Sequence, residues 1–351
     1  MKITDTKLRP YSIPLKEKWL SHSHSSDTRQ GYLLQIGDTL GNIGYGDCAP
    51  LPGHGTETSA EALKSLEQQL PSFSGLQTTD ALNKLPDMNV GPAVRCAIEM
   101  ALLDLKTKKE DIPLHKWLNP KSSPMVKANA NVGALNQDTR ERIDIAIRQG
   151  YKILKLKVGL FKPEEELKLL NQICTDLPSD IQLRLDANQA WDTKTAKYIL
   201  KEIEQMPIES LEEPIAGSNL DTLRQLQDGT NITMALDEST TYLDTKQLLQ
   251  LKPLRRIIVK PTVLGGVLPA LRLGQQAHDL GVETVVTTTV DSAAGVWAAT
   301  QLAAALDSNG KLHHGIATSG WLQQDLGAGP KFTNGCIAMP QTSGLGFVPY
   351  N

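Results

Sequence analysis

Aromatic residues, cysteines and long hydrophobic runs are scarce in this sequence, and each scarcity argues against a class of protein. Phe, Trp and Tyr make up 5% of the 351 residues and form no stripe on which nucleic-acid bases would stack. No window approaches the ~18 apolar residues that a membrane-spanning helix needs. The widely separated cysteines form no CxxC pair, which argues against a disulfide framework and a structural zinc site; they are Cys48, Cys96, Cys174 and Cys336.

Charge is nearly balanced along the chain. The sequence has 36 Lys and Arg against 39 Asp and Glu, a net charge of −3, and no basic cluster marks a nucleic-acid or anionic-membrane surface. The opening MKITDTKLRPYSIPL lacks the apolar core of a signal peptide, which predicts a cytoplasmic location. We therefore expect a small-molecule partner, no nucleic acid and no membrane; the sequence does not specify an oligomeric state.

The first 125 residues have the pattern of a compact α+β unit. Strands are predicted at Lys2–Ile13, Gly31–Ile36 and Ile43–Cys48, and helices at Glu57–Leu70 and Pro92–Lys106. Pro92 suits the first turn of its helix. The polar stretch Ser21–Asp27, which contains His22 and His24, is expected to be a solvated loop.

From Val126 onward, short apolar runs alternate with helical patterns. The predicted strands are Val126–Val132, Ile153–Val158, Ile181–Asp186, Ile208–Glu212, Ile232–Asp237, Arg256–Lys260, Glu283–Thr288 and His313–Ala317. Helical patterns include Pro163–Ile173, Thr193–Gln205, Leu220–Gln227 and Leu268–Leu280. Eight strands alternating with seven helices predict an α/β fold, a parallel (β/α)7β barrel over residues 126–317, with residues 318–351 returning to the first unit. An open doubly wound sheet is the alternative, but no GxGxxG or GxxxxGKS/T loop opens any of these helices.

Charged residues stand at the ends of five successive predicted strands, where the active site of a barrel lies. They are Lys155 and Lys157; Arg184, Asp186 and Asn188; Glu212 and Glu213; Asp237; and Lys260. Alone, such an acid is an ordinary helix N-cap and such a lysine an ordinary exposed side chain. Three acids at one barrel mouth, however, would repel each other by on the order of a few kcal/mol per pair without a cation between them. Because every proposed ligand is an oxygen, the sequence predicts Mg²⁺ rather than Zn²⁺, with Mn²⁺ as a substitute.

The five strand-end motifs KLK, DAN, EEP, DES and VKP resemble the muconate-lactonizing branch of the enolase superfamily over nearly the whole chain. That resemblance implies an N-terminal α+β capping domain and a (β/α)7β barrel. It implies that Asp186, Glu212 and Asp237 bind the metal, with Asn188 and Glu213 orienting them. Lys157 and Lys260 correspond to the acid–base lysines, and Lys155 to the neighbour that lowers the pKa of the base.

Within this branch the chain is most similar to the o-succinylbenzoate synthases, through Arg29-Gln-Gly31, Gly44-Tyr-Gly46-Asp47 and His314–Ser319. This similarity implies Mg²⁺-dependent syn-dehydration of 2-succinyl-6-hydroxy-2,4-cyclohexadiene-1-carboxylate to 2-succinylbenzoate, a step of menaquinone or phylloquinone synthesis. Asp47 departs from the glutamate that is usual in the family. The turn Thr287–Ser292 replaces the family's serine-rich turn. Thr288 and Thr289, with the start of the following helix, would bind the succinyl carboxylate, or the turn is simply solvated.

Other functions remain compatible with these residues. An N-acylamino acid racemase or a dipeptide epimerase would use the same two lysines on opposite faces of the substrate. Dipeptide epimerases of this branch carry Asp-x-Asp near the eighth strand, where this chain reads HHGIATSG. A muconate-type cycloisomerase and a non-catalytic binding protein are further alternatives. His313 and His314 are expected to be structural, and Arg184 is expected to pair with the acids one layer above it.

Overall fold

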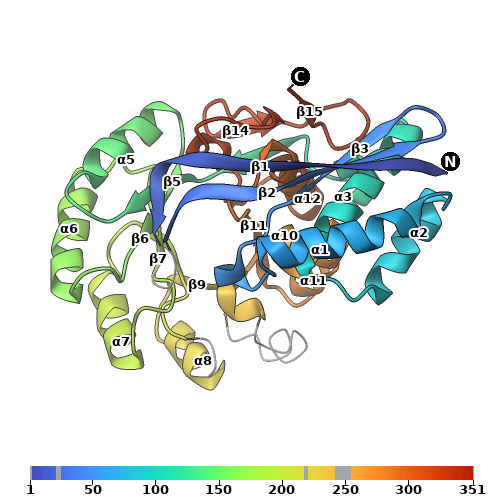
Figure 1. Cartoon of the computed structure of the whole chain (residues 1–351). Coiled ribbons are helices and arrows are strands. Elements are labelled where there is room, and N and C mark those ends of the chain that lie inside the picture. The colour runs from blue at the N-terminus through green and yellow to red at the C-terminus, as the bar shows by residue number, and fades with distance from the viewer. Residues whose placement is uncertain (1, 21–24, 217–219, 242–253, 351) are drawn as a thin grey trace.

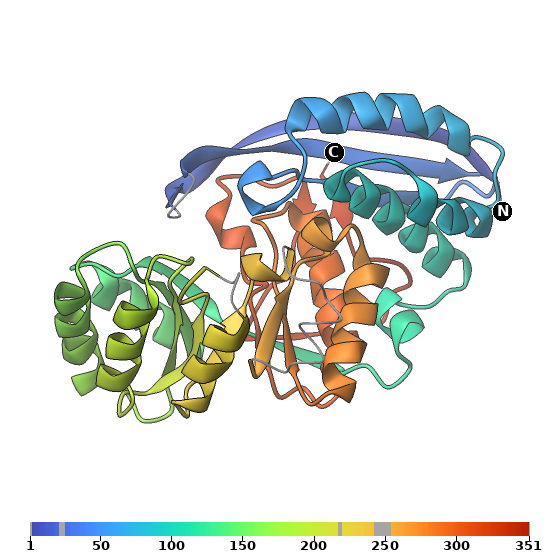
Figure 2. The same cartoon turned by 90° about the horizontal axis from the view of Figure 1, so that it is seen from below.

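The structure, a computed structural model, describes residues 2–20, 25–216, 220–241 and 254–350 (Figure 1). Residues 21–24, with His22 and His24, lie outside the described part. The rest of the predicted loop, residues 25–27, belongs to a strand instead. The first sheet is antiparallel, in the order β1 (Ile3–Leu20), β2 (Ser25–Asp38) and β3 (Ile43–Cys48). Helices α1 (Ser59–Gln69), α2 (Thr78–Lys84) and α3 (Pro92–Lys109) follow. Figure 2 shows this part, in blue and teal, beside the orange part of the barrel.

The predicted elements of this first unit are present, with longer strands. β3 has the predicted bounds, but β1 continues past Pro14 to Leu20. A proline is tolerated there because β1 is an edge strand, on which a missing N–H need not break a ladder bond. The start of α1 is fixed by a capping box, in which the Thr58 side chain accepts from the Glu61 N–H and the Glu61 side chain accepts from the Thr58 N–H.

β3 lies close against α3 because its glycines have no side chain. A Cβ at Gly46 would collide with the backbone carbonyl of Ala97, and one at Gly44 with that of Ala101. The glycine-rich turn of the sequence therefore sets the distance between the sheet and its helix.

Gly46→Ala is expected to destabilise the fold by about 1–3 kcal/mol, because the colliding atom belongs to a helix backbone that cannot rotate away. Urea unfolding followed by circular dichroism measures this loss. Gly229→Ala is the matched control, since a Cβ there would lie 3.4 Å from the Gln225 carbonyl, an ordinary contact. Equal unfolding midpoints for the two variants would show that the close approach is not needed.

The second sheet is parallel and has the strand order β11-β10-β9-β8-β7-β6-β5. Its strands are β5 (Ala130–Ala134), β6 (Ile153–Lys157), β7 (Gln182–Asp186), β8 (Ile208–Glu212), β9 (Thr233–Leu236), β10 (Arg256–Val259) and β11 (Glu283–Val286). β4 (Met125–Ala128) directly precedes β5 and pairs in parallel with β12 (His313–His314). Thr287, just after β11, forms a parallel bridge with Gly315, just after β12. β12 thus contacts both the last strand of the sheet and β4, which closes the barrel. The predicted (β/α)7β barrel is confirmed.

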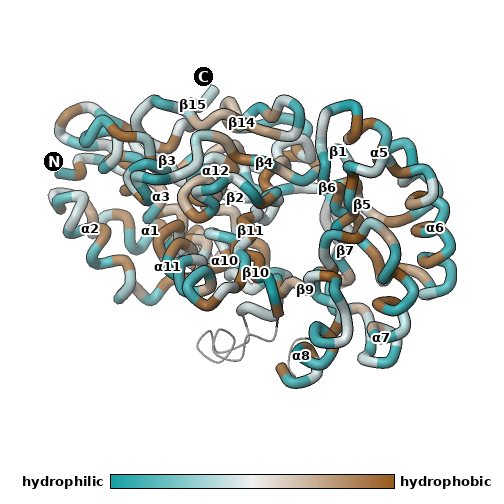
Figure 3. Tube along the Cα trace, turned by 180° about the vertical axis from the view of Figure 1, so that it is seen from behind, coloured by the Kyte–Doolittle hydropathy of each residue, from teal (hydrophilic) through white to brown (hydrophobic). Residues whose placement is uncertain are grey.

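Helices surround this sheet. They are α5 (Thr139–Arg148), α6 (Pro163–Thr175), α7 (Thr193–Glu202), α8 (Leu220–Asp228), α10 (Pro261–Leu264), α11 (Val267–Asp279) and α12 (Ala293–Leu306). Brown and teal positions alternate along α5, α6 and α7 in Figure 3, as expected for helices with one face on the core. In α6, for example, Leu167, Leu170 and Ile173 are buried at helical spacing. Residues 242–253, between β9 and β10, lie outside the described part.

The last residues contact both halves of the molecule. β14 (Cys336–Ala338) pairs antiparallel with β4 of the barrel, and Leu322 forms a bridge with Leu15 of β1. The Leu345 N–H donates to Asp104 of α3 over 2.7 Å. Smaller elements complete the chain: α4 (Leu114–Leu118), β13 (Gly327–Ala328) and β15 (Val348–Pro349). The division into a capping domain of residues 1–125, completed by residues 318–351, and a barrel of residues 126–317 stays a prediction.

Among the helices of the described ranges, none has the combined length and hydrophobicity of a membrane span.

Candidate active site

Strand register brings the predicted acids and lysines to one end of the barrel. Lys157 is the register partner of Asp186, and Asp186 is the partner of Glu212, so the ends of β6, β7 and β8 are level. Asp237 and Lys260 directly follow β9 and β10. All five side chains are buried, with residue exposures between 1% and 8%. The lysines of β6 and β10 thus flank the three strands that carry the acids.

Lysine ammonium groups pair with the three carboxylates. Lys155 Nζ lies 2.8 Å from Asp186 Oδ2 and 2.8 Å from Glu212 Oε1. Lys260 Nζ lies 2.5 Å from Asp237 Oδ2. Within the described residues, no group of three His, Cys, Asp or Glu side chains is placed to hold a metal ion. The acids converge, but in this arrangement the positive charge among them is supplied by lysine.

The chemistry of the donor set nevertheless fits a hard divalent cation. Three buried carboxylates from adjacent strands offer only oxygen atoms, which is the set that Mg²⁺ and Mn²⁺ prefer. Burial raises the pKa of Glu212 well above its usual range, and the charges of Asp186 and Asp237 add to that effect against the opposing charge of Lys155. A divalent ion among these oxygens would compensate the repulsion more fully than one ammonium group.

The two flanking lysines have opposite protonation tendencies in this arrangement. Burial lowers the pKa of Lys157, as do the positive charges of Lys155 and Lys260, although Asp186 opposes them. Burial also disfavours the charged form of Lys260, but Asp237 and Glu238 outweigh it and raise its pKa. Lys157 Nζ donates to Asn188 Oδ1 over 3.0 Å, which fixes its direction.

Glu213 binds the backbone beside Asp237, and Asn188 binds the side chains of Lys157 and Glu238; that they orient the metal ligands stays a prediction. Glu213 accepts hydrogen bonds from the backbone N–H groups of Asp237 and Ser239, at 2.7 and 2.8 Å. Asn188 Nδ2 donates to Glu238 over 2.9 Å. Both residues have left-handed backbone conformations, with φ of 42° for Asn188 and 45° for Glu213. Such strain is typical of strand ends at functional sites, where the surroundings impose the geometry.

Thr288 and Thr289 line the same pocket as the lysines, but the start of the following helix is already occupied. The Ser292 N–H donates to Asp47, and the Ala293 N–H donates to Asp325, each over 2.8 Å. Thr289 Oγ1 donates to Asp291 over 2.5 Å. Because three carboxylates of the protein surround this helix start, the expectation that it binds a substrate carboxylate is wrong. The substrate contacts of the two threonines stay a prediction.

Arg184 does not pair with the metal-binding candidates. It forms an ion pair with Glu209, at 3.2 Å, and donates to Asn129 Oδ1 over 3.0 Å. Its register partners are Lys155 and Ser210, one layer below Asp186. The prediction that Arg184 forms ion pairs with the acids above it is therefore wrong, because its guanidinium pairs with Glu209 on the neighbouring strand. His314 is structural as predicted, since its Nδ1 accepts from the Val286 N–H over 3.0 Å.

Residues outside the barrel motifs also reach the site. His54 and Leu51, from the first unit, line the pocket together with Asn129 and Asn131 of the first barrel strand. Burial lowers the pKa of His54 to about 3, and the positive charge of Lys260 adds to the effect, so its imidazole is neutral. Nothing in the sequence directly indicates that His54 lines the site; it stands at the end of the glycine-rich stretch, in Pro52-Gly-His54-Gly.

A capped parallel barrel with acids and lysines gathered at its carboxyl strand ends has the architecture of an acid–base enzyme. Residues 138–350 match the family model described as enolase C-terminal domain-like, and residues 3–105 match the model described as MenC, N-terminal domain. The chain belongs to the enolase superfamily.

Similar proteins in this superfamily catalyse different reactions. The chain is 28% identical to an L-Ala-D/L-Glu epimerase of Clostridium acetobutylicum, over 100% of both chains. It is 31% identical to an o-succinylbenzoate synthase of Yersinia enterocolitica, over 85% of this chain and 84% of that protein. A dipeptide epimerase of Enterococcus faecalis, solved with Mg and the dipeptide L-Leu-L-Tyr, superposes with a TM-score of 0.89 at 25% identity, over 99% of both chains. These relatives are enzymes, but they do not single out one reaction.

Proposed function

We propose that this chain is an o-succinylbenzoate synthase, which dehydrates 2-succinyl-6-hydroxy-2,4-cyclohexadiene-1-carboxylate to 2-succinylbenzoate. The observation that carries the proposal is the placement of Lys157 and Lys260 on either side of three strands that end in Asp186, Glu212 and Asp237. An amine on each flank of an acid cluster suits the removal of a proton beside a carboxylate.

Asp186, Glu212 and Asp237 would hold one Mg²⁺, for which Mn²⁺ would substitute. The ion supplies electrostatic stabilisation of the negative charge that develops on the substrate carboxylate. For this to happen, Lys155 has to leave the bridge between Asp186 and Glu212 and Lys260 has to leave Asp237.

Lys157 then transfers the proton. Neutral Lys157 Nζ takes the proton α to the carboxylate, and the C–H electron pair moves onto the carboxylate oxygens. As that pair returns to the ring, the bond to the 6-hydroxyl group breaks, and protonated Lys157 gives its proton to the leaving hydroxide. Water and the aromatic product result, and Lys157 is neutral again. Lys260 keeps its positive charge and stabilises the anionic intermediate from the other side.

Two observations favour dehydration within this superfamily. The first unit matches the MenC N-terminal model over residues 3–105. The segment after β12 reads Gly315-Ile-Ala317-Thr-Ser319 and carries no acid that would hold the ammonium group of a dipeptide.

Racemisation of N-acylamino acids or epimerisation of dipeptides is the second candidate. The observation that favours it is the full-length similarity to an L-Ala-D/L-Glu epimerase. In that reaction both lysines would exchange protons, one on each face of the α carbon.

Assays of the purified protein with Mg²⁺ separate the two candidates. We expect turnover of the cyclohexadiene substrate, measured as the loss of its conjugated dienone absorbance. N-succinylamino acids and dipeptides are assayed in parallel by polarimetry. Turnover of dipeptides or N-acylamino acids alone would reject the synthase in favour of the second candidate. Turnover of none of these substrates would reject both.

A further inference from the structure

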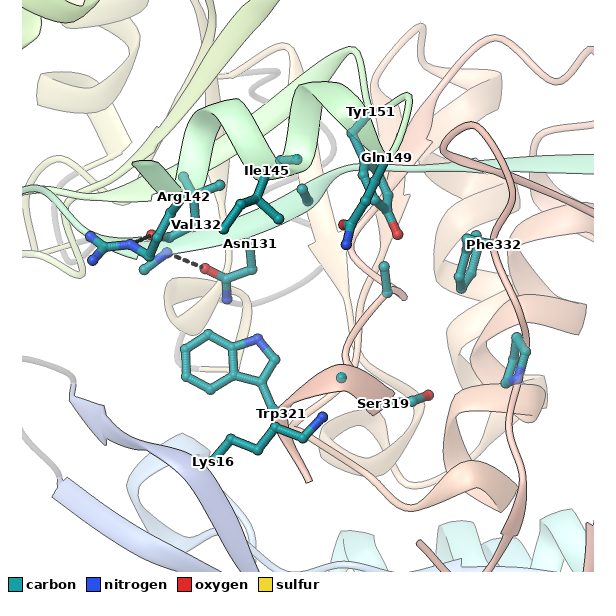
Figure 4. Close-up of a pocket in the computed structure, with 16 residues that line it drawn as sticks. Lys16, Asn131, Val132, Arg142, Ile145, Gln149, Tyr151, Ser319, Trp321 and Phe332 are labelled. Carbon is teal, nitrogen blue, oxygen red and sulfur yellow. Dashed lines mark hydrogen bonds between the residues drawn. The ribbon is translucent and has the colours of Figure 1, made fainter. Parts of the chain in front are cut away.

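A second, larger pocket adjoins the catalytic one (Figure 4). Its volume is about 530 Å³, within the range of small-molecule sites. It lies between β5 and α5 on one side and the segment after β12 on the other, and Lys16 of β1 borders it. Asn131 and Ala317 line both pockets, so the two cavities are neighbours.

The catalytic pocket is small while the lysines are paired with the acids. That pocket has a volume of about 50 Å³, which is the space of one or two water molecules. Releasing the lysine–carboxylate pairs makes room for a metal ion and a carboxylate there, but a long acyl chain needs further space. The neighbouring pocket, at about 530 Å³, offers that space.

The charged side chains that line the larger pocket are both cationic. Within the described residues its lining contains the cations Lys16 and Arg142 and no Asp or Glu. The structure describes no ion pair of Lys16, whereas the Arg142 guanidinium is held by the carbonyls of Val132 and Ala134. Figure 4 shows the amides of Asn131 and Gln149 on the side of the pocket that faces Trp321 and Lys16.

The same pocket offers apolar surface for a chain. Trp321, Tyr151 and Phe332 lie around it, together with Ile145 of α5. A ligand group that is apolar along its length and anionic at its end would match both features.

The other place at which an anionic chain end would have been expected is closed. At the start of α12, the N–H groups of Ser292 and Ala293 donate to Asp47 and Asp325. The Thr289 hydroxyl donates to a third acid, Asp291. A substrate carboxylate there would meet like charges in a buried setting, which costs binding free energy.

We propose that this pocket is the subsite for the distal carboxylate of a dicarboxylate substrate, with Lys16 as the group that recognises the charge. The inference rests on the proposed function, in which the succinyl chain carries that carboxylate. On this proposal the distal carboxylate of the succinyl group binds near β1, β5 and the segment after β12, and not at the turn before α12. A substrate with a positively charged chain end, such as the free amino group of a dipeptide, would find no acid among the described residues that line this pocket.

Calorimetry with a matched pair of ligands tests the subsite without depending on turnover. The pair is 2-succinylbenzoate and its analogue in which the side-chain carboxylate is a primary amide, titrated in the presence of Mg²⁺. Wild-type protein is expected to bind the diacid about 10-fold to 100-fold more tightly than the amide, the effect of one charged hydrogen-bonded contact.

Lys16→Met is expected to reduce this preference to less than about 3-fold, because methionine keeps the length of the side chain without its charge. Gln149→Glu is expected to weaken diacid binding by about 10-fold or more and amide binding far less, because it adds a negative charge to the pocket. Lys7→Met is the control, since Lys7 is exposed on the same strand and does not line the pocket.

Full charge preference in Lys16→Met and in Gln149→Glu, with normal turnover of the cyclohexadiene substrate, would overturn the subsite and leave the proposed function standing. A wild-type protein that neither binds the diacid nor turns over the substrate would overturn both.

Discussion

Lys157→Ala is expected to lower kcat for the cyclohexadiene substrate by about 10²-fold to 10⁴-fold, the contribution of a positioned general base. The reason is positional: Lys157 Nζ is buried, fixed by Asn188 and level with the acids of β7 and β8. Circular dichroism and an unfolding curve establish that the variant is folded.

Lys157→Arg sharpens the same test. Arginine keeps the positive charge but does not lose its proton, so it is expected to be as inactive as alanine if the residue acts as a base. Recovery of activity with arginine would mean that Lys157 contributes only its charge. Lys201→Ala, at an exposed position of α7, is the control and is expected to leave kcat unchanged.

The lysine pair also separates the two candidate reactions. In a dehydration with Lys157 as the one base, Lys260→Ala is expected to abolish turnover of the cyclohexadiene substrate. Neither single variant is then expected to exchange the α proton of an N-acylamino acid with solvent. In a racemase, each single variant would still exchange the α proton of one enantiomer in D₂O, as seen by proton NMR. Such one-sided exchange of an N-acylamino acid would reassign the chain to the second candidate.

Removal of the divalent ion is the second change with a large expected effect. Dialysis against a chelator is expected to reduce activity by more than about 10³-fold, because the charge that forms on the substrate carboxylate would lose its main stabilisation. Activity is expected to return with Mg²⁺ and with Mn²⁺. Full activity after chelation, with metal content checked by elemental analysis, would contradict the metal assignment.

Glu212→Gln is the matched variant for this prediction. It keeps the shape of the side chain but removes one of the three charges, so it is expected to weaken Mg²⁺ binding by at least about 10-fold in calorimetry. Glu202→Gln, an exposed residue of α7, is the control. Equal Mg²⁺ affinity in both variants would exclude Glu212 from the metal site.

Much of the architecture follows from local patterns. The eight barrel strands were predictable because each is a short apolar run between polar helical stretches, and β8 has the predicted bounds of Ile208–Glu212. The convergence of acids and lysines was predictable for the same reason, since parallel strands place their carboxyl ends on one side. α2 was not predicted, and α5 was expected only as one of the seven alternating helices, without bounds.

The pairing of side chains was not predictable, because it joins residues that are distant in the sequence. Asp47 accepts a hydrogen bond from the N–H of Ser292, 245 positions away. It therefore occupies the start of α12, where the sequence predicted that a substrate carboxylate would bind. Arg184 finds Glu209 on the next strand rather than the acids above it. His54 enters the catalytic pocket from the first unit, and nothing in its immediate sequence specifies that direction.

A crystal structure of the protein grown with Mn²⁺, with anomalous data collected at the manganese edge, tests most directly whether one ion organises this site. The expected result is a single anomalous peak about 2–2.3 Å from carboxylate oxygens of Asp186, Glu212 and Asp237, with Lys155 no longer bridging two of them. A map in which Lys155 still joins Asp186 to Glu212 and no peak lies among the three acids would contradict the proposed chemistry.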